Sequence, residues 1–207
     1  MHRRRTRHDR KKPAQPSRPR LSCDDRRSGL VESMKIVVFS DNHRDREVVG
    51  RILLLNPDAD RILSLGDSEM REDELSALGI YGVKGNYPFE PDFPDELTTV
   101  FEGWKTFIAH GHRYGVKNGL YWLSERARAE ECDMALFGHT HTPFLEERDG
   151  IVFLNPGSAA RPRSGSGGTY AVIEASESEL KIAIRDVDAN KALHTLSKRK
   201  GRTPSWR

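Results

Sequence analysis

The chain has 207 residues but only two cysteines, and aromatic residues make up 8% of it. Cys23 and Cys132 give no disulfide framework, because Cys23 lies in a segment that we expect to be disordered. No apolar run approaches the roughly 20 residues that a helix needs to span a bilayer. No apolar stretch of the kind found in secretory signals follows the N-terminal charges. We therefore expect a cytoplasmic protein with no membrane partner.

Basic residues are scarce in the middle of the chain. Residues 1–33 carry eleven Lys and Arg against four Asp and Glu, and residues 188–207 carry six against one. Residues 34–187 therefore hold 17 basic and 26 acidic residues, so the formal net charge of +3 conceals an acidic body. Such a body repels long polyanions, which disfavours a nuclease unless the tails or a local basic strip compensate.

Both ends of the chain are predicted to be tails. Residues 1–33 combine like charges with few large apolar side chains, which predicts disorder. Met34 directly precedes the first predicted strand, so this segment has two readings: an upstream start-codon assignment or a nucleic-acid-binding tail. Residues 188–207 are expected to be a second, solvated basic tail. This division leaves residues 34–187 as the single domain.

Short apolar runs recur along the domain, and each ends in a polar or glycine-rich turn. Their length and β-branched content favour strands over helices. The runs span residues 36–39, 61–65, 81–84, 106–109, 134–137 and 151–154, and two alternating stretches, "TYAVIEA" and "LKIAIRDV", are expected to be antiparallel strands. Helical spacing in "DREVVGRILLLN", "SEMREDELSALG" and "NGLYWLSERARAEEC" places helices between them. The alternation predicts an α/β protein.

Polar residues with the chemistry of metal ligands follow these six runs. In open α/β sheets ligands bind beyond the carboxyl ends of the strands, so this position is informative. The residues that follow the runs are Asp41-Asn42-His43, Gly66-Asp67, Gly85-Asn86, His110-Gly111-His112, Gly138-His139-Thr140-His141 and Asn155-Pro156-Gly157-Ser158. Each piece alone is compatible with an ordinary turn or surface histidines. Their repetition at one sheet edge favours a metal site.

The donor atoms of these side chains narrow the choice of metal ion. Oxygen and imidazole donors without thiolates suit Mn²⁺, Fe²⁺, Zn²⁺, Co²⁺ or Ni²⁺ and exclude a structural zinc knot. In an extended segment, residues i and i+2 point the same way, so we expect Asp41 with His43, and His139 with His141, to reach into one cleft. Glycines beside Asp67, Asn86, His110 and His139 allow close backbone approach.

In this order, the motifs Asp-x-His, Gly-Asp, Gly-Asn, His-Gly-His and Gly-His-Thr-His resemble those of the calcineurin-like metallophosphoesterase superfamily. The short chain, "AHGHRYGVK" and "GHTHTPFLEERDGIVFLNPGS" resemble its small YfcE-like phosphodiesterase group. The resemblance covers about residues 34–187. It implies a four-layer α/β/β/α sandwich with a dinuclear metal site, and relatives commonly form homodimers or homotetramers.

The resemblance also implies a ligand set for each metal. Asp41, His43 and His141 would hold one ion, Asn86, His110 and His139 the other, and Asp67 would bridge the two. Two such cations clamp a phosphoryl group and turn a shared water into hydroxide at neutral pH. We name Asp67, Asn86 and His112 as candidate catalytic residues, with His112 at the edge of the cleft. Mn²⁺ is the metal that we expect.

The chain departs from the family pattern after Asn86. Many members have His there and closer relatives have Cys followed by Asp, whereas this chain has Tyr87 and Pro88. A tyrosine hydroxyl donates a hydrogen bond but is a poor proton donor at neutral pH. Arg44 stands where a glycine is common. Arg44 and Arg161, with Arg163 nearby, are candidate phosphate contacts, although a solvent-facing Arg44 is the plainer reading.

These features predict a metal-dependent phosphodiesterase in which a metal-bridging hydroxide attacks a small phosphodiester or nucleotide. The alternative is a catalytically weak scaffold of the same fold that binds proteins, as retromer's phosphoesterase-like subunit does. Loss of ligands would favour the scaffold, but all seven positions hold competent residues, and only Tyr87 points that way. A third reading is a nucleic-acid-associated protein that uses its basic tails.

Overall fold

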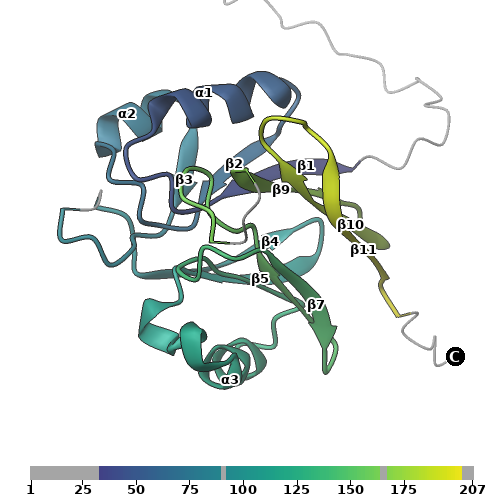
Figure 1. Ribbon diagram of the computed structural model, residues 1–207. Coiled ribbons are helices and arrows are strands. Elements are labelled where there is room, and N and C mark those ends of the chain that lie inside the picture. Colours follow the sequence, from purple (N-terminus) through teal and green to yellow (C-terminus); the bar gives the residue numbers. More distant parts are fainter. Residues whose placement is uncertain (1–32, 90–91, 164–166, 202–207) are drawn as a thin grey trace, which may run out of the picture. The chain divides into compact units, whose positions relative to one another are not determined.

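The computed structural model describes residues 33–89, 92–163 and 167–201. The strands form two sheets, A and B (Figure 1). Sheet A has the order β11-β10-β9-β1-β2-β3 and consists of β1 (Met34–Phe39), β2 (Arg61–Ser64), β3 (Ile80–Gly82), β9 (Thr169–Ala175), β10 (Glu179–Asp186) and β11 (Ala192–Arg199). Sheet B has the order β4-β5-β6-β8-β7 and consists of β4 (Glu96–Phe101), β5 (Trp104–Ala109), β6 (Met134–Leu136), β7 (Phe144–Arg148) and β8 (Ile151–Asn155).

The three predicted helices are present, each shorter than its sequence pattern. They are α1 (Arg46–Leu55), α2 (Glu72–Ala77) and α3 (Tyr121–Ala129), and two 3₁₀ turns, η1 (His112–Tyr114) and η2 (Val116–Asn118), precede α3. Asp45 caps α1, because its side chain accepts a hydrogen bond from the backbone N–H of Val48 at 2.9 Å. Asn56 ends α1 directly before Pro57, and its side-chain amide donates to the carbonyl of Ile52 at 2.9 Å.

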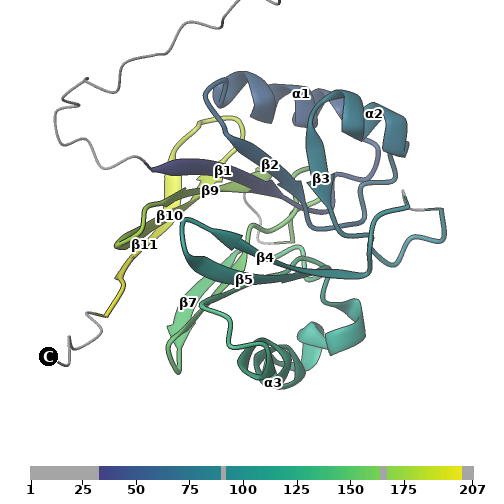
Figure 2. The same cartoon turned by 180° about the vertical axis from the view of Figure 1, so that it is seen from behind.

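Three apolar clusters define four layers (Figure 2). The central cluster lies between the sheets, where Val38 and Ile173 of sheet A meet Ile108 and Leu136 of sheet B. A second cluster packs α1 and α2 on the outer face of sheet A, and a third packs α3 on the outer face of sheet B. The predicted α/β/β/α sandwich is therefore confirmed.

Parallel pairing brings the ends of six strands to the candidate site. In sheet A, β1 pairs in parallel with β2, and β2 with β3. In sheet B, β5 pairs in parallel with β6, and β6 with β8. The carboxyl ends of each parallel set therefore share one edge, which places the six polar loops together.

Three strands were not predicted, and one of them moves the domain boundary. β4, β7 and β11 lie at sheet edges, and β11 pairs along its length with β10. The boundary at residue 187 therefore falls inside sheet A, and the expectation of a solvated tail is wrong for residues 192–199. The predicted N-terminal tail, up to residue 32, and residues 202–207 lie outside the described residues. In the described part of the chain, no helix is long and apolar enough to cross a membrane.

Candidate metal centre

The candidate ligands sit on loops whose backbone is left-handed. The φ angles are positive at five of the seven: Asp41 (54°), His43 (44°), Asp67 (46°), His139 (68°) and His141 (59°). Residues other than glycine rarely adopt this conformation, and such backbone strain gathers at functional sites. The expectation of extended segments with i and i+2 side chains aligned is therefore wrong. His139 instead faces His110, with ring centroids 5.1 Å apart, and His141 faces His43, also at 5.1 Å.

Asp41, His43 and His141 form a first cluster, as the resemblance implies. The Nε2 atoms of His43 and His141 lie 3.4 Å apart, and His141 Nε2 lies 3.2 Å from Asp41 Oδ1. One ligand atom from each of the three residues falls within 4.8 Å of the others. Carboxylate oxygen and imidazole nitrogen at this spacing suit one transition-metal ion.

Asp41, Asp67 and His110 form a second cluster. His110 Nε2 lies 3.6 Å from Asp67 Oδ2 and 3.9 Å from Asp41 Oδ1. Asp41 thus belongs to both clusters, whereas the resemblance gave the shared position to Asp67. His139 approaches this cluster through its ring contact with His110. Asn86 approaches it through its backbone, which donates to Asp67 at 2.8 Å.

Hydrogen bonds on the far side of three rings orient the histidines. His43 Nδ1 lies 2.8 Å from Oε1 of Glu69, His110 Nδ1 lies 2.7 Å from the carbonyl of Leu65, and His141 Nδ1 lies 2.9 Å from the carbonyl of Arg161. Each of these oxygens is an acceptor, so each Nδ1 carries the proton. The neutral ring then presents the lone pair of Nε2 to the site, the arrangement that metal-binding histidines use.

The carboxylates of Asp41 and Asp67 are also held by hydrogen bonds to one of their two oxygens, which leaves the other oxygen facing the site. Asp41 Oδ2 accepts the backbone N–H of His139 at 3.1 Å, and Asp67 Oδ1 accepts those of Asn86 and Tyr87 at 2.8 and 3.0 Å. The opposite oxygens face His110 and His141. Among the described residues, Asp41 Oδ1 and His110 Nε2 are buried without a hydrogen-bond partner. Buried orphan atoms of these types fit a bound cation.

The electrostatics keep both carboxylates ionised. Burial raises the pKa of Asp41 and of Asp67, but the neighbouring histidines and hydrogen bonds outweigh it and lower both pKa values. Burial lowers the pKa of His110, but Asp67 and Asp41 outweigh it and raise that pKa. Burial and the charges of His110 and Lys117 lower the pKa of His139 to about 4. Two buried carboxylates that stay ionised, beside imidazole nitrogens, make a site complementary to divalent cations.

The other candidate residues lie around these clusters. The ring of His112, in η1, lies 5.5 Å from that of His110 and 6.1 Å from that of His139, between centroids. Arg44 is half exposed and contacts Tyr87 and Glu69. Arg161 is exposed, and its carbonyl supports His141. The backbone N–H of Arg163 donates to the carbonyl of His141 at 3.1 Å.

Three supporting residues were missed from the sequence. Glu69 supports His43, although an acidic residue just before a helix looks like part of that helix's first turn. Asn155 donates from its buried amide to Gly138 O at 2.9 Å and to Thr140 Oγ1 at 3.0 Å. Ser158 donates to the carbonyl of Asp41 at 2.7 Å. Their place after the sixth apolar run was the only signal for Asn155 and Ser158.

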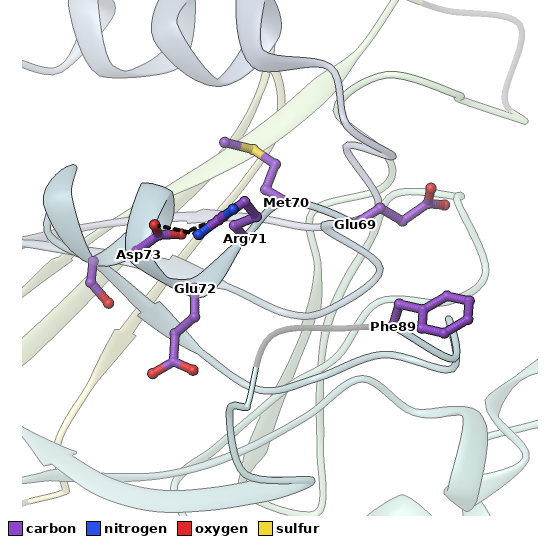
Figure 3. Close-up of a pocket in the computed structure, with 7 residues that line it drawn as sticks. Glu69, Met70, Arg71, Glu72, Asp73 and Phe89 are labelled. Atoms are coloured by element: carbon purple, nitrogen blue, oxygen red, sulfur yellow. Dashed lines mark hydrogen bonds and ion pairs between the residues drawn. The ribbon is translucent and has the colours of Figure 1, made fainter.

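A hollow of about 560 Å³ lies beside the site and shares Glu69 with it. Its lining is Glu69, Met70, Arg71, Glu72, Asp73, Ser76 and Phe89 (Figure 3). Arg71 is held within this lining by Asp73, with Nε–Oδ1 and Nη2–Oδ2 distances of 2.8 and 2.9 Å. Phe89 is 80% exposed and meets Tyr87 edge-on at 5.8 Å. The hollow thus borders the first cluster through Glu69, whose carboxylate contacts His43.

A family model confirms the resemblance. Residues 34–178 match the calcineurin-like phosphoesterase superfamily domain. The chain belongs to this superfamily. It is 32% identical over 159 residues to the probable metallophosphoesterase YsnB of Bacillus subtilis, covering 76% of this chain and 94% of that protein.

Two further relatives agree with this assignment. Phosphodiesterase YfcE of Escherichia coli K12 is 31% identical over 103 residues, which cover 46% of this chain and 52% of YfcE. A predicted phosphoesterase from Streptococcus pneumoniae superposes with a TM-score of 0.73 at 30% identity, covering 83% of this chain and all of that one. The predicted likeness to the YfcE-like group is therefore confirmed, and the chain is a metal-binding phosphoesterase by family.

Proposed function

We propose that this protein is a phosphodiesterase that uses two divalent metal ions to hydrolyse a small phosphodiester or nucleotide. The convergence of five ligand-type side chains in two clusters that share Asp41, with the Nδ1 atoms of His43, His110 and His141 bonded on the side away from the site, is the observation that carries the proposal. Asp41, His43 and His141 would hold one ion. Asn86, His110 and His139 would hold the other, and Asp67 or Asp41 would be shared.

The metals would supply Lewis acidity and a hydroxide nucleophile at neutral pH. Mn²⁺ is our choice, with Ni²⁺, Fe²⁺, Zn²⁺ and Co²⁺ as alternatives of the same ligand class. The residues around the ligands would do the rest. Arg44 and Arg161 would bind the phosphoryl oxygens and orient the diester. His112, at the edge of the cluster, would donate a hydrogen bond to the leaving oxygen.

The charge of the body favours a small substrate, and a cytoplasmic location stays a prediction. Residues 34–187 hold 26 acidic and 17 basic residues, so a long polyanion would be repelled outside the immediate rim of the site. Nucleic acid as a partner would depend on the basic N-terminal segment. A homodimer or homotetramer remains our prediction for the assembly.

The competing proposal is a scaffold of the same fold with weak catalysis. Tyr87, in place of the family's His or Cys, favours it. Against it stand the buried ligand atoms Asp41 Oδ1 and His110 Nε2, which lack a hydrogen-bond partner among the described residues and would be costly to keep without a metal.

Hydrolysis of bis(p-nitrophenyl) phosphate and of p-nitrophenyl phosphate with Mn²⁺, by wild type and Asp67→Asn, tests the proposal. We expect metal-dependent turnover that prefers the diester, and at least about a hundredfold loss in Asp67→Asn. Asp149→Asn is the matched control, because Asp149 is an exposed aspartate with a similar φ of 50°. If the wild type bound two ions per chain and still hydrolysed neither substrate, the proposal of an enzyme would be overturned and the scaffold would be favoured.

A further inference from the structure

Four side chains form a continuous path from the rim of the site to a metal ligand. Arg44 Nη2 donates to the hydroxyl of Tyr87, and the guanidinium lies 5.2 Å from the centroid of the Tyr87 ring. On its other side, Arg44 Nε lies 3.4 Å from Oε2 of Glu69. The second oxygen of Glu69, Oε1, lies 2.8 Å from Nδ1 of His43. Glu69 therefore joins a metal ligand to the arginine at the rim.

The path is anchored in three loops that carry ligands. His43 and Arg44 follow β1, Glu69 follows β2, and Tyr87 follows β3. The backbone N–H of Arg44 donates to Ser68 O at 2.9 Å, and that of Tyr87 to Asp67 Oδ1 at 3.0 Å. Arg44 and Glu69 both adopt left-handed backbone, with φ of 66° and 55°. Left-handed backbone is strained in residues with long side chains, and such strain gathers at functional sites, which indicates a functional role for these loops.

The contacts leave Arg44 free to take a phosphate. A guanidinium has five N–H donors, and Tyr87 and Glu69 engage two of its nitrogens. The side chain is still 56% exposed. A long arginine loses rotamer entropy when it binds, so an arginine already fixed on both sides binds an anion at lower cost.

We propose that Tyr87 and Glu69 are positioning residues that hold Arg44 for the substrate phosphate, and that Glu69 also fixes His43 for its metal. This inference rests on the proposed phosphodiesterase. It assigns a role to Tyr87, the position where the chain departs from its family. The tyrosine hydroxyl accepts the hydrogen bond of Arg44, and we assign Tyr87 a role that acts through Arg44 in place of protonation of the leaving group.

The role of Tyr87 is tested by the affinity of the Mn²⁺-loaded protein for inorganic phosphate, measured by calorimetry. We expect Arg44→Ala to weaken binding about tenfold, and Tyr87→Phe, which keeps the ring, to weaken it about threefold. The double variant should bind no more weakly than Arg44→Ala alone, because Tyr87 has nothing left to position. The role of Tyr87 would be overturned if the two losses of phosphate affinity multiplied in the double variant. Unchanged phosphate binding in Tyr87→Phe would also overturn it.

Kinetics separate positioning from proton donation. If Tyr87 positions Arg44, Tyr87→Phe raises KM more than it lowers kcat, equally for diesters with good and poor leaving groups. If Tyr87 were the proton donor, kcat would fall and would fall most for the poorest leaving group. That second outcome would overturn the proposal.

The role of Glu69 is tested by Mn²⁺ titration and by ¹⁵N chemical shifts of His43 in the metal-free protein. We expect Glu69→Ala to weaken one of two Mn²⁺ sites by about tenfold to a hundredfold, and to remove the preference for a proton on His43 Nδ1. Glu69→Gln keeps an acceptor for His43 but loses the charge that faces Arg44. It should therefore restore metal affinity and still bind phosphate weakly.

Glu72→Ala is the control, because Glu72 is an exposed glutamate of the same hollow. It should change neither Mn²⁺ sites nor the His43 shifts. Wild-type Mn²⁺ affinity and His43 shifts in Glu69→Ala would overturn the role of Glu69. Metal and phosphate binding are measured without turnover, so a protein that binds both yet hydrolyses no diester would refute the proposed function but not the support of Arg44 by Tyr87 and of His43 by Glu69.

Discussion

Gly85 lies so close to Asp67 that a side-chain carbon at Gly85 would sit 2.0 Å from Oδ1 of Asp67. The same oxygen accepts the backbone N–H groups of Asn86 and Tyr87. The loop after β3 thus wraps around a carboxylate from the loop after β2. Only a residue without a side chain permits this contact, which places Asn86 beside the candidate metal centre.

Replacing Gly85 with alanine is expected to displace the Asp67 carboxylate. A shift on the order of 1 Å at a catalytic group costs about a hundredfold in rate, so diesterase activity should fall by about that factor. Mn²⁺ binding, measured by calorimetry, should weaken in parallel.

Gly50→Ala is the matched control, because no atom lies within 4 Å of a Cβ added at Gly50, in α1. Alanine is the better helix former, so this variant should gain about 0.5–1 kcal/mol of stability with unchanged activity. Wild-type activity and metal affinity in Gly85→Ala would show that the loop adjusts and that Gly85 is dispensable.

Tyr114 is expected to hold the turn that carries His112, and its contribution should depend on pH. Its hydroxyl donates to Glu96 of β4, which also pairs with Arg126 of α3 at 2.8 Å. The hydrogen bond from Tyr114 and the charge of Arg126 lower the pKa of Glu96 against an opposing effect of burial. Burial and the bond to Glu96 raise the pKa of Tyr114 to about 12.

The signs of these shifts give the pH window. Since the folded pKa of Glu96 is depressed, its contribution is present above its unfolded pKa and is lost as pH falls through the folded pKa. The folded pKa of Tyr114 is raised to about 12. The contribution of Tyr114 to stability is therefore present below its unfolded pKa of about 10 and is lost as pH rises through the folded pKa. Tyr114→Phe should cost about 1 kcal/mol near neutral pH and less at either extreme, as measured by urea unfolding.

Tyr121→Phe serves as the reference for this series. Tyr121 is 63% exposed at the start of α3, and its substitution should leave the free energy of unfolding unchanged at every pH. If Tyr114→Phe lost as much free energy of unfolding in acid as at neutral pH, the ionised carboxylate of Glu96 would not be the cause of the loss.

The strands that sequence predicted and the strands that it missed differ in burial. β1 and β8 are buried along most of their length, so each appears as an apolar run. β4, β7 and β11 carry exposed residues at many positions and lie at the ends of their sheets. An edge strand needs little apolar sequence, because one side has no neighbouring strand. Apolar composition therefore identified the buried strands, including the short edge strand β3, and not the more exposed edge strands β4, β7 and β11.

The candidate site divides in a similar way. The identity of the candidate ligand residues follows from polar motifs at strand ends, which sequence displays directly. The left-handed backbone at Asp41 and His139, and the support of His43 by Glu69, arise from contacts between loops that are distant in sequence. No local pattern records such contacts. Five of the seven predicted ligand residues lie in the two clusters, but the extended backbone expected to align them is absent.

Two basic residues at the end of β11 and directly after it, Lys198 and Lys200, are expected to stabilise the sandwich. Lys198 Nζ lies 3.0 Å from Glu147 Oε1 and donates to the carbonyl of Gly150, and Lys200 lies 4.9 Å from the centre of the Trp104 ring. The end of the described chain, from β11 to Lys200, therefore contacts two hairpins of sheet B. The free energy of unfolding of a chain that ends at Val187 should be at least about 2 kcal/mol lower than that of a chain that ends at Gly201. Equal urea midpoints would restore the predicted boundary at residue 187.

Asn155 is expected to hold the loop of His139 and His141, and Asn56 offers a matched comparison. Both are buried asparagines whose amide donates to a backbone carbonyl at 2.9 Å, Asn155 to Gly138 and Asn56 to Ile52. Removing either amide deletes a buried hydrogen bond to a backbone carbonyl. Both alanine variants should therefore lose about 1–3 kcal/mol of stability, measured by urea unfolding without metal.

Metal binding should separate the two variants. The carbonyl of Gly138 directly precedes His139, and the amide of Asn155 also reaches Thr140 at 3.0 Å, between the two histidines. Asn155→Ala should therefore weaken Mn²⁺ binding by about tenfold, whereas Asn56→Ala, at the end of α1, should bind Mn²⁺ as wild type does. If the two variants bound Mn²⁺ equally, Asn155 would serve stability alone, and the orientation of His139 and His141 would have to come from their own left-handed backbone and from the carbonyl of Arg161.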